Sequence, residues 1–162
     1  MAFHDVVKTY NSRMVKVSFD GNQLTGMADD TFVTIEQKGN GVISKSGVDG
    51  EVARAVDPNE QFTVRFVLLQ TSASNDILQN SYQEDIRNGT GIGELVINDM
   101  RGGEVFFAKA AWVSKQPTRT YGKDTINREW TLETGPARMS FDQYSNYTSG
   151  EGYNNQNTVY AN

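Results

Sequence analysis

The sequence has no cysteine and only one histidine, His4, among its 162 residues. Without cysteine the chain can form neither a disulfide framework nor a thiolate metal site, and one imidazole is too few for a histidine-based zinc site. His4 lies close to a chain end, where segments are usually poorly ordered, whereas a catalytic triad needs a rigidly held imidazole. We therefore predict no enzymatic activity, no metal and no cofactor.

Acidic pairs are the remaining candidates for site chemistry, and the sequence offers Asp29-Asp30 and Glu84-Asp85. Neighbouring side chains on a strand or a helix diverge, so a turn and a solvated helix face are the favoured interpretations. An all-oxygen calcium or magnesium site at Asp29 or Asp30 stays open as the alternative. Glycine-rich residues 89–93 follow a predicted helix, whereas phosphate-binding loops precede one, so these glycines indicate a helix end.

Basic runs and long apolar runs are also missing from the sequence. The formal net charge of −5 disfavours a nucleic-acid-binding protein, because such a protein needs a basic patch to neutralise phosphates. No apolar run approaches the roughly 18 residues of a membrane span, and the N-terminus lacks the apolar core of a signal peptide. We therefore expect no membrane partner and a chain that is made and kept in a cytoplasm.

Residues 47–88 contain the strongest structural signals: two candidate strands, a turn at residues 57–59 and the one convincing helix. In residues 61–70, Phe62, Val64, Phe66 and Leu68 fall on one face, because strand side chains alternate. Leu78, Tyr82 and Ile86 then recur at helical spacing, and Asn88-Gly89 ends the helix. A strand pair followed by one amphipathic helix predicts a helix that covers a sheet.

The rest of the chain is read mainly as strands. Alternation or β-branched content predicts strands over residues 13–19, 31–38, 94–100, 104–115 and 125–134. Phe106, Ala108, Ala110 and Trp112 are expected on one side of their strand. A length of 162 residues, of which 37% are hydrophobic, suits one domain over residues 1–142. Residues 143–162 are rich in tyrosine and asparagine and carry a single charged residue after Asp142, which predicts a C-terminal extension.

Residues 39–50 are polar and contain four glycines. This composition predicts a long, flexible hairpin tip between the strands at 31–38 and 51–55, and exposed loops of this length tend to carry function. Arg54 lies near Asp49 and Glu51 in the sequence. An ion-pair network within the chain and a contact across a subunit boundary are equally supported there.

Five segments stand out by their sequence and order: LTGMADDTFVTIEQ, GVDGEVARA, FTVRFVLLQTSASNDIL, GELVINDMRGG and AWVSKQPTRTYGKDTINREWTLE. In this order they resemble the tail tube proteins of contractile-tailed bacteriophages, and more narrowly a small family of conserved phage structural proteins. The resemblance implies the tail-tube fold, which the type VI secretion tube protein shares. That fold is mainly β, with two packed antiparallel sheets forming a β-barrel-like sandwich and one flanking α-helix.

The resemblance also implies a structural virion protein of the tail tube, assembled in the host cytoplasm. Hexameric rings of the subunit would stack into the conduit for DNA delivery, and genomic DNA would pass through the lumen without specific binding. The implied partners are other copies of the chain, the tail sheath, the baseplate initiator and the tail terminator. The alternatives are a tube protein of a secretion or contractile injection system and a monomeric ligand-binding β-barrel.

Ring closure and ring stacking both need contacts between copies of the chain. A long projecting loop such as residues 39–50 has the reach for ring stacking. We therefore predict that the subunit and ring-stacking interface contains Val42, Ile43, Lys45, Asp49, Glu51 and Arg54.

Overall fold

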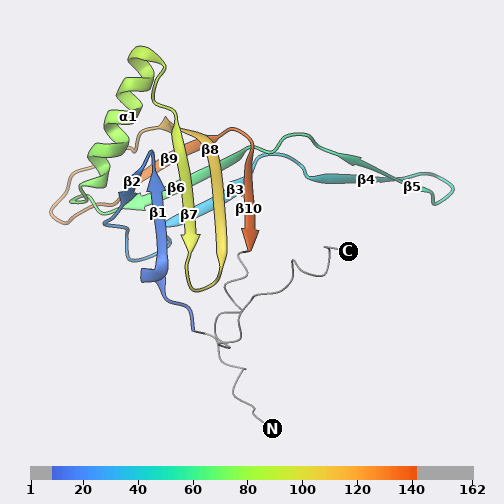
Figure 1. The fold of residues 1–162 in the computed structure, drawn as a ribbon, viewed down its shortest axis with the longest axis horizontal. Helices are drawn as coiled ribbons and strands as arrows, with labels where there is room; N and C mark the ends of the chain where they lie inside the picture. The colour runs from blue at the N-terminus through green and yellow to red at the C-terminus, as the bar shows by residue number, and fades with distance from the viewer. Residues whose placement is uncertain (1–8, 142–162) are drawn as a thin grey trace, which may run out of the picture.

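The structure is a computed structural model that describes residues 9–141. It contains a short 3-10 helix η2 (Ser12–Met14), one α-helix and ten strands (Figure 1). The α-helix is α1 (Ser74–Asn88), and the strands are β1 (Val15–Phe19), β2 (Asn22–Leu24), β3 (Val33–Gln37), β4 (Val42–Ser46), β5 (Val52–Val56), β6 (Phe62–Leu68), β7 (Gly93–Asp99), β8 (Glu104–Lys115), β9 (Arg128–Thr134) and β10 (Ala137–Phe141). The predicted extension at residues 143–162 lies outside the described residues.

Eight strands form one antiparallel sheet in the order β2-β1-β7-β8-β9-β6-β3, with β10 also paired to β8. The first half of β8 lies between β7 and β10, whereas its second half pairs with β9. The sheet therefore folds over along β8 into two layers. β1, β7 and β10 lie in one layer, and β9, β6 and β3 cross behind them in the other (Figure 1). The predicted mainly-β fold of two packed antiparallel layers with one helix is confirmed.

The space between the two layers is filled by large apolar side chains. The core includes Phe19, Phe66, Phe106, Trp130 and Leu132, all of them almost fully buried. Across this core the rings of Phe62 and Phe106 meet edge to face, with centroids 5.2 Å apart. Edge-to-face contact is a favoured arrangement of aromatic rings and adds to the stabilisation from apolar burial.

The expectation that Trp112 shares a face with Phe106 and Ala108 is wrong. A register shift gives β8 one more residue than β7 between the pairs Leu95–Ala108 and Gly93–Ala111. An extra residue in one strand reverses the side-chain alternation beyond it. Ala111 is therefore buried, and Trp112 is only half-buried on the outer side.

The helix α1 is held to the sheet chiefly at its first turn. The buried Ser74 hydroxyl accepts a hydrogen bond from the Thr25 amide at 2.7 Å, and the side-chain Oδ1 of Asn75 accepts one from the Trp130 indole N–H at 2.9 Å. Gly89 ends the helix in the left-handed conformation, as the Asn-Gly signal predicts. The apolar stripe is shorter than expected, because Leu78 is buried but Ile86 is 71% exposed.

The predicted strand pair before the helix is also wrong. β5 pairs only with β4, whereas β6 pairs with β3 and β9. The turn at residues 57–59 therefore does not close a hairpin. It marks the point where the chain returns from a projecting segment into the sandwich.

Candidate functional site

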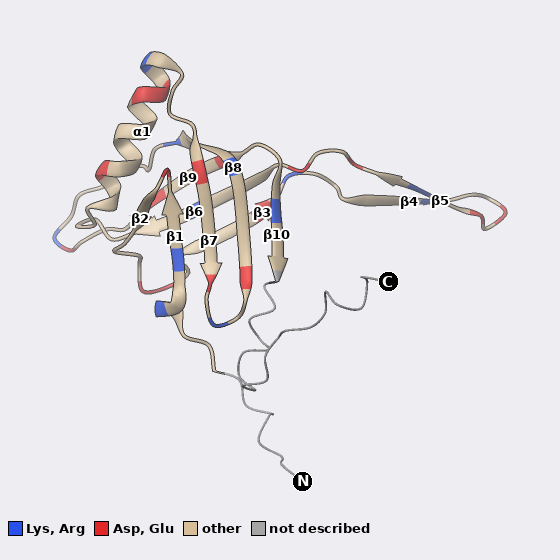
Figure 2. Cartoon of the chain, in the orientation of Figure 1, with Lys and Arg blue, Asp and Glu red and all other residues tan. Residues whose placement is uncertain are grey.

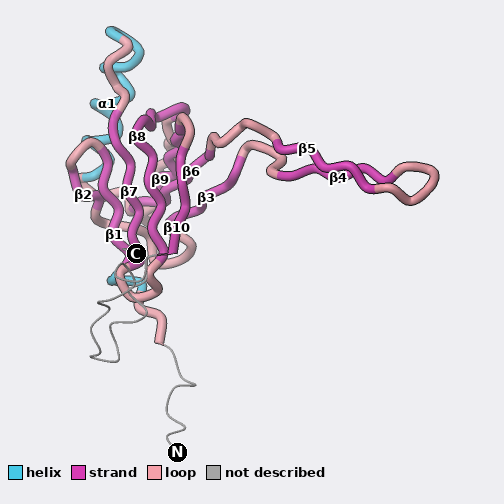
Figure 3. The backbone as a smooth tube through the Cα atoms, turned by 45° about the vertical axis from the view of Figure 1, so that its right-hand side comes forward, coloured by secondary structure: helices cyan, strands magenta, loops and turns pink. Residues whose placement is uncertain are grey.

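The most exposed part of the described structure is the β4–β5 ribbon, residues 42–56. β4 and β5 form a separate two-stranded sheet, and all ten of their residues are exposed. Two views show the ribbon pointing away from the sandwich (Figures 1 and 3). A lone two-stranded hairpin is at best marginally stable in water, so this ribbon is a segment that would gain from a partner.

The ribbon displays aliphatic side chains that its own subunit does not cover. The strand register places Val42 opposite Val56, Ser44 opposite Arg54 and Ser46 opposite Val52 on one face. The exposed fraction is 52% for Val42 and 75% for Val56. Val48, at the tip, is fully exposed. Grouped exposed apolar side chains are typical of a surface that binds another protein.

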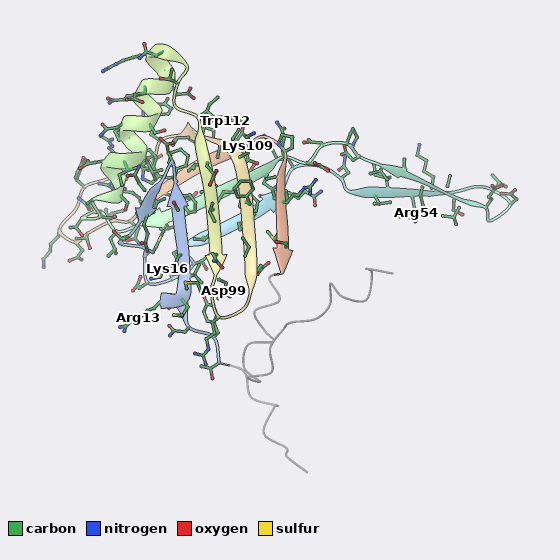
Figure 4. The ribbon with its side chains drawn as sticks, in the orientation of Figure 1. Arg13, Lys16, Arg54, Asp99, Lys109 and Trp112 are labelled. Atoms are coloured by element: carbon green, nitrogen blue, oxygen red, sulfur yellow. The ribbon has the colours of Figure 1, made fainter. Side chains whose placement is uncertain are left out.

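Charges of opposite sign lie at different positions along the ribbon. Lys45 and Arg54 lie on the strands, and Asp49 and Glu51 lie at the tip (Figure 2). The ion pairs between described residues are Lys38–Glu133 and Arg65–Glu36. Of the two alternatives for Arg54, the network with Asp49 and Glu51 therefore does not form within residues 9–141, and a contact across a subunit boundary stays a prediction. Figure 4 labels Arg54 in the middle of the ribbon, far from the sandwich.

The six residues predicted as an interface all lie on this ribbon. Val42, Ile43 and Lys45 belong to β4, Arg54 belongs to β5, and Asp49 and Glu51 lie in the turn between them. Their role stays a prediction. The flexible loop expected at residues 39–50 instead contains β4 and the turn after it. β4 pairs with β5 over five residues, and the polar composition of the segment gave no sign of this pairing.

The base of the ribbon is fixed by the carboxylate of Asp57. Its Oδ2 accepts a hydrogen bond from the Asn40 amide at 2.8 Å, and its Oδ1 accepts one from the Asn59 amide at 3.0 Å. These amide hydrogen bonds hold the pKa of Asp57 below its usual value of 3.8. Gly39 lies against the carbonyl of Asn59, where a Cβ would clash. One charged side chain therefore joins the two chain segments from which the ribbon emerges.

A second surface feature is an open groove of about 830 Å³ at one end of the sandwich, between the two layers. Its lining comes from η2, from the segment before β3 and from strands of both layers: Tyr10, Ser12, Val15, Ala28, Asp29, Asp30, Thr31, Phe32, Val33, Ile35, Ile97, Asp99, Glu104, Phe106 and Met139. Sequence reasoning missed this groove because its lining residues are distant in the chain. The pair Asp29-Asp30 was the only signal, and a turn was its favoured interpretation.

Within residues 9–141 no group of three or more histidine or acidic side chains is placed to hold a metal ion. None of the helices in the described residues has the length and the apolar character needed to cross a bilayer.

Comparison with known proteins shows which family this chain matches. A family model described as "Bacteriophage PhiTE tail tube protein" matches residues 1–140. The chain is also 25% identical over 111 residues to "Structural protein ORF10" of Pseudomonas phage KPP10. That match covers 67% of this chain and 64% of the phage protein, so it spans less than two thirds of the relative's length.

Several solved structures share the fold. A chain from the virion of a native gene transfer agent particle superposes with a TM-score of 0.58 at 8% identity, covering 82% of this chain and 99% of that chain. A chain from the sheath-tube complex of PVC, an extracellular contractile injection system, gives a TM-score of 0.53 at 14% identity, covering 84% and 94%. The sequence resemblance to phage tail tube proteins is confirmed by the family match.

Proposed function

The chain belongs to the bacteriophage PhiTE tail tube protein family, and we propose that it is the structural subunit of a tail tube. In this proposal the subunits form hexameric rings, and the rings stack into the conduit through which phage DNA is delivered. The observation that carries the proposal is the β4–β5 ribbon. It is an ordered segment with apolar side chains and no core of its own, which is what a subunit needs to join a larger assembly.

Open sheet edges support the same proposal. Within residues 9–141, β2, β3 and β10 each pair with another strand on one side only. An unpaired edge exposes N–H and C=O groups that can pair with a strand of another chain. When an edge of one subunit pairs with a different edge of the next, the contact is head-to-tail. Such contacts close into a ring if the rotation between subunits allows it, and a contact repeated along the ring axis gives a tube.

The partners follow from this role. Other copies of the chain would contact the ribbon through Val42, Ile43, Lys45, Asp49, Glu51 and Arg54. The tail sheath, the baseplate initiator and the tail terminator would contact the assembled tube, in the virion, after assembly in the host cytoplasm. The net charge of −5 suits a conduit that does not retain passing DNA. The role requires no catalysis.

A tube protein of a contractile injection system is the second candidate. The likeness to a chain of the PVC sheath-tube complex favours it, although that likeness is one of fold. Both candidates use the same ribbon and differ in what passes through the tube.

The proposal is tested by electron microscopy and sedimentation of the purified full-length chain, alone and with the cognate tail initiator complex. Rings or tubes of uniform width are the expected result. The variant Val56→Asp should lose assembly, because it places a charge on the apolar face of the ribbon. The matched control is Ile86→Asp, since Ile86 is an aliphatic residue of similar exposure, 71% against 75%, on the helix.

A wild-type chain that stays monomeric in both conditions would overturn the tube. Equal loss of assembly in the two variants would instead overturn the assignment of assembly to the ribbon.

A further inference from the structure

We propose that Asn40 is a site of spontaneous covalent modification, at which the side-chain amide is lost and the backbone at the base of the β4–β5 ribbon is altered. The reaction is deamidation through a cyclic imide, and water is its only co-reactant. Asn-Gly pairs favour this chemistry, because a glycine has no side chain to hinder the approach of its own nitrogen to the preceding amide. The chain contains two such pairs, Asn40-Gly41 and Asn88-Gly89, and their surroundings in the fold differ.

Ring closure joins two groups that are neighbours in the chain. The backbone nitrogen of Gly41 loses its proton and attacks the side-chain carbonyl carbon of Asn40. A new C–N bond forms, the bond from that carbon to the side-chain nitrogen breaks, and this nitrogen leaves as ammonia with the proton. Water then opens the imide at one of its two carbonyls. The product is either an aspartate in a normal backbone or an isoaspartate, whose main chain is longer by one CH₂ group.

The Asn40-Gly41 pair is open to this reaction. The N–H of Gly41 donates no hydrogen bond to any residue of the described range 9–141. The space beside Gly41 is empty, since the heavy atom nearest to the position of a Cβ, beyond its chain neighbours, is Nε2 of Gln37 at 4.0 Å. Asn40 is exposed. Water and base therefore reach both reacting groups.

The Asn88-Gly89 pair is held against the same reaction. Asn88 is the last residue of α1, and the N–H of Gly89 donates to the carbonyl oxygen of Asp85 at 2.9 Å. Helical torsions keep the Asn88 side chain away from the next nitrogen, and the hydrogen bond must break before that nitrogen can lose its proton. This protection lasts as long as the helix end stays formed. The fold therefore selects Asn40 from two pairs with the same sequence.

The modification changes the contacts at the base of the ribbon. The Asn40 N–H donates to Oδ2 of Asp57 at 2.8 Å and is the largest cause of the lowered pKa of Asp57, so Asp57 is ionised at neutral pH. Deamidation adds a second carboxylate beside it, and like charges repel. Isoaspartate also displaces Gly41, whose carbonyl oxygen accepts the Asp57 N–H at 2.7 Å. Both hydrogen bonds between residues 40–41 and Asp57 are therefore weakened.

Mass spectrometry of the full-length chain, incubated under native conditions and in urea, tests the inference. Trypsin separates the two sites, because Asn40 falls in residues 39–45 and Asn88 in residues 88–101. Replacement of –NH₂ by –OH changes the mass of each peptide, and fragment ions assign the change to its residue. In the native chain Asn40 should react at least about tenfold faster than Asn88, whereas in urea the two rates should agree within about threefold.

The variant Asn40→Gln is the control for this assignment. It should abolish the mass change in residues 39–45, which contain no other side-chain amide. Equal rates at Asn40 and Asn88 in the native chain, or a faster reaction at Asn88, would overturn the inference.

The variant Asn40→Asp carries the charge of the product and tests the effect on the ribbon. Hydrogen–deuterium exchange in residues 42–56 should be about threefold faster than in the wild-type chain, because the repulsion at Asp57 weakens the base of the ribbon. Asn88→Asp is the matched control, since it makes the same change at the other pair and should leave exchange in residues 42–56 unaltered. Wild-type exchange in Asn40→Asp would overturn this effect.

An effect on assembly rests on the proposed function, which assigns assembly to the ribbon. Wild-type chain that is incubated until most of its Asn40 has reacted should assemble less than fresh chain, whereas incubated Asn40→Gln should assemble as its fresh form does. Incubated wild-type chain that assembles normally would overturn the effect on assembly and leave the site at Asn40 standing. Fresh wild-type chain that forms no ring or tube would overturn the proposed function, and the rates at Asn40 and Asn88 would still test the site.

Discussion

The sandwich and the ribbon are both built from paired antiparallel strands, but the strands of the sandwich enclose a buried core and those of the ribbon are exposed. In β9, and in β6 from Val64 onward, every second side chain is buried, and both strands contribute to the core that contains Phe106. In β4 and β5 no residue is buried, although the pairing is just as regular. Regular strand pairing therefore does not by itself indicate a stable fold. In this chain the sandwich carries the stability of the subunit, and we propose that the ribbon carries its assembly.

The comparison is sharpest for one residue type placed in both regions. Val64 is fully buried in β6, and Val56 is 75% exposed in β5. Val64→Ala should lower the free energy of unfolding by about 2–3 kcal/mol, because it removes buried methyl groups and leaves a cavity. Val56→Ala should change it by less than about 0.5 kcal/mol. Urea unfolding of the unassembled subunit measures both, and equal losses would break the distinction between the regions.

Two serines make the same comparison for a hydrogen bond. Ser74 is buried and accepts from the Thr25 amide at 2.7 Å, whereas the Ser46 hydroxyl on the ribbon makes only a 3.4 Å contact to the Gly47 carbonyl. Ser74→Ala should cost about 1–2 kcal/mol of unfolding free energy, because the Thr25 amide loses its acceptor. Ser46→Ala should leave thermal unfolding unchanged. A stable Ser74→Ala variant would show that α1 is not anchored through this bond.

The smallest expected effect is at the boundary between the regions, where Asp57 holds the base of the ribbon. Its pKa is lowered by the two amide hydrogen bonds, so the folded state favours the charged form. The stabilisation is therefore complete above the usual value of 3.8 and is lost as the pH falls below it through the lowered pKa. Carboxyl-carbon NMR titration should give a midpoint below 3.8. A midpoint at or above that value would contradict this role.

Local sequence patterns predicted much of the sandwich because its signals are local. The alternation around Val64 and Phe66 and the Asn88-Gly89 helix end both act over a few residues, and each appears in the structure. The pairing of β6 with β3 rather than β5 depends on contacts between distant segments, which no local pattern contains. The register shift at Ala111 was missed for a related reason, since only the pairing with β7 reveals it.

The candidate site divides in the same way. All six residues predicted for the interface are close in the sequence, and the structure gathers them on one ribbon. The groove is different, because Asp29, Ile97, Glu104 and Met139 meet only after the sheet has folded over along β8. Residues of one hairpin lie close in the sequence and can be grouped from it, whereas a surface made between layers is visible only in the fold.

Hydrogen–deuterium exchange on free and assembled full-length chain tests the central claim most directly. In the free subunit the amides of residues 42–56 should exchange much faster than those of β6 and β9, because no core covers the ribbon. On assembly the ribbon amides should become protected while those of the sandwich core change little. If rings or tubes form and exchange at residues 42–56 stays as fast as in the free subunit, the ribbon is not the assembly surface.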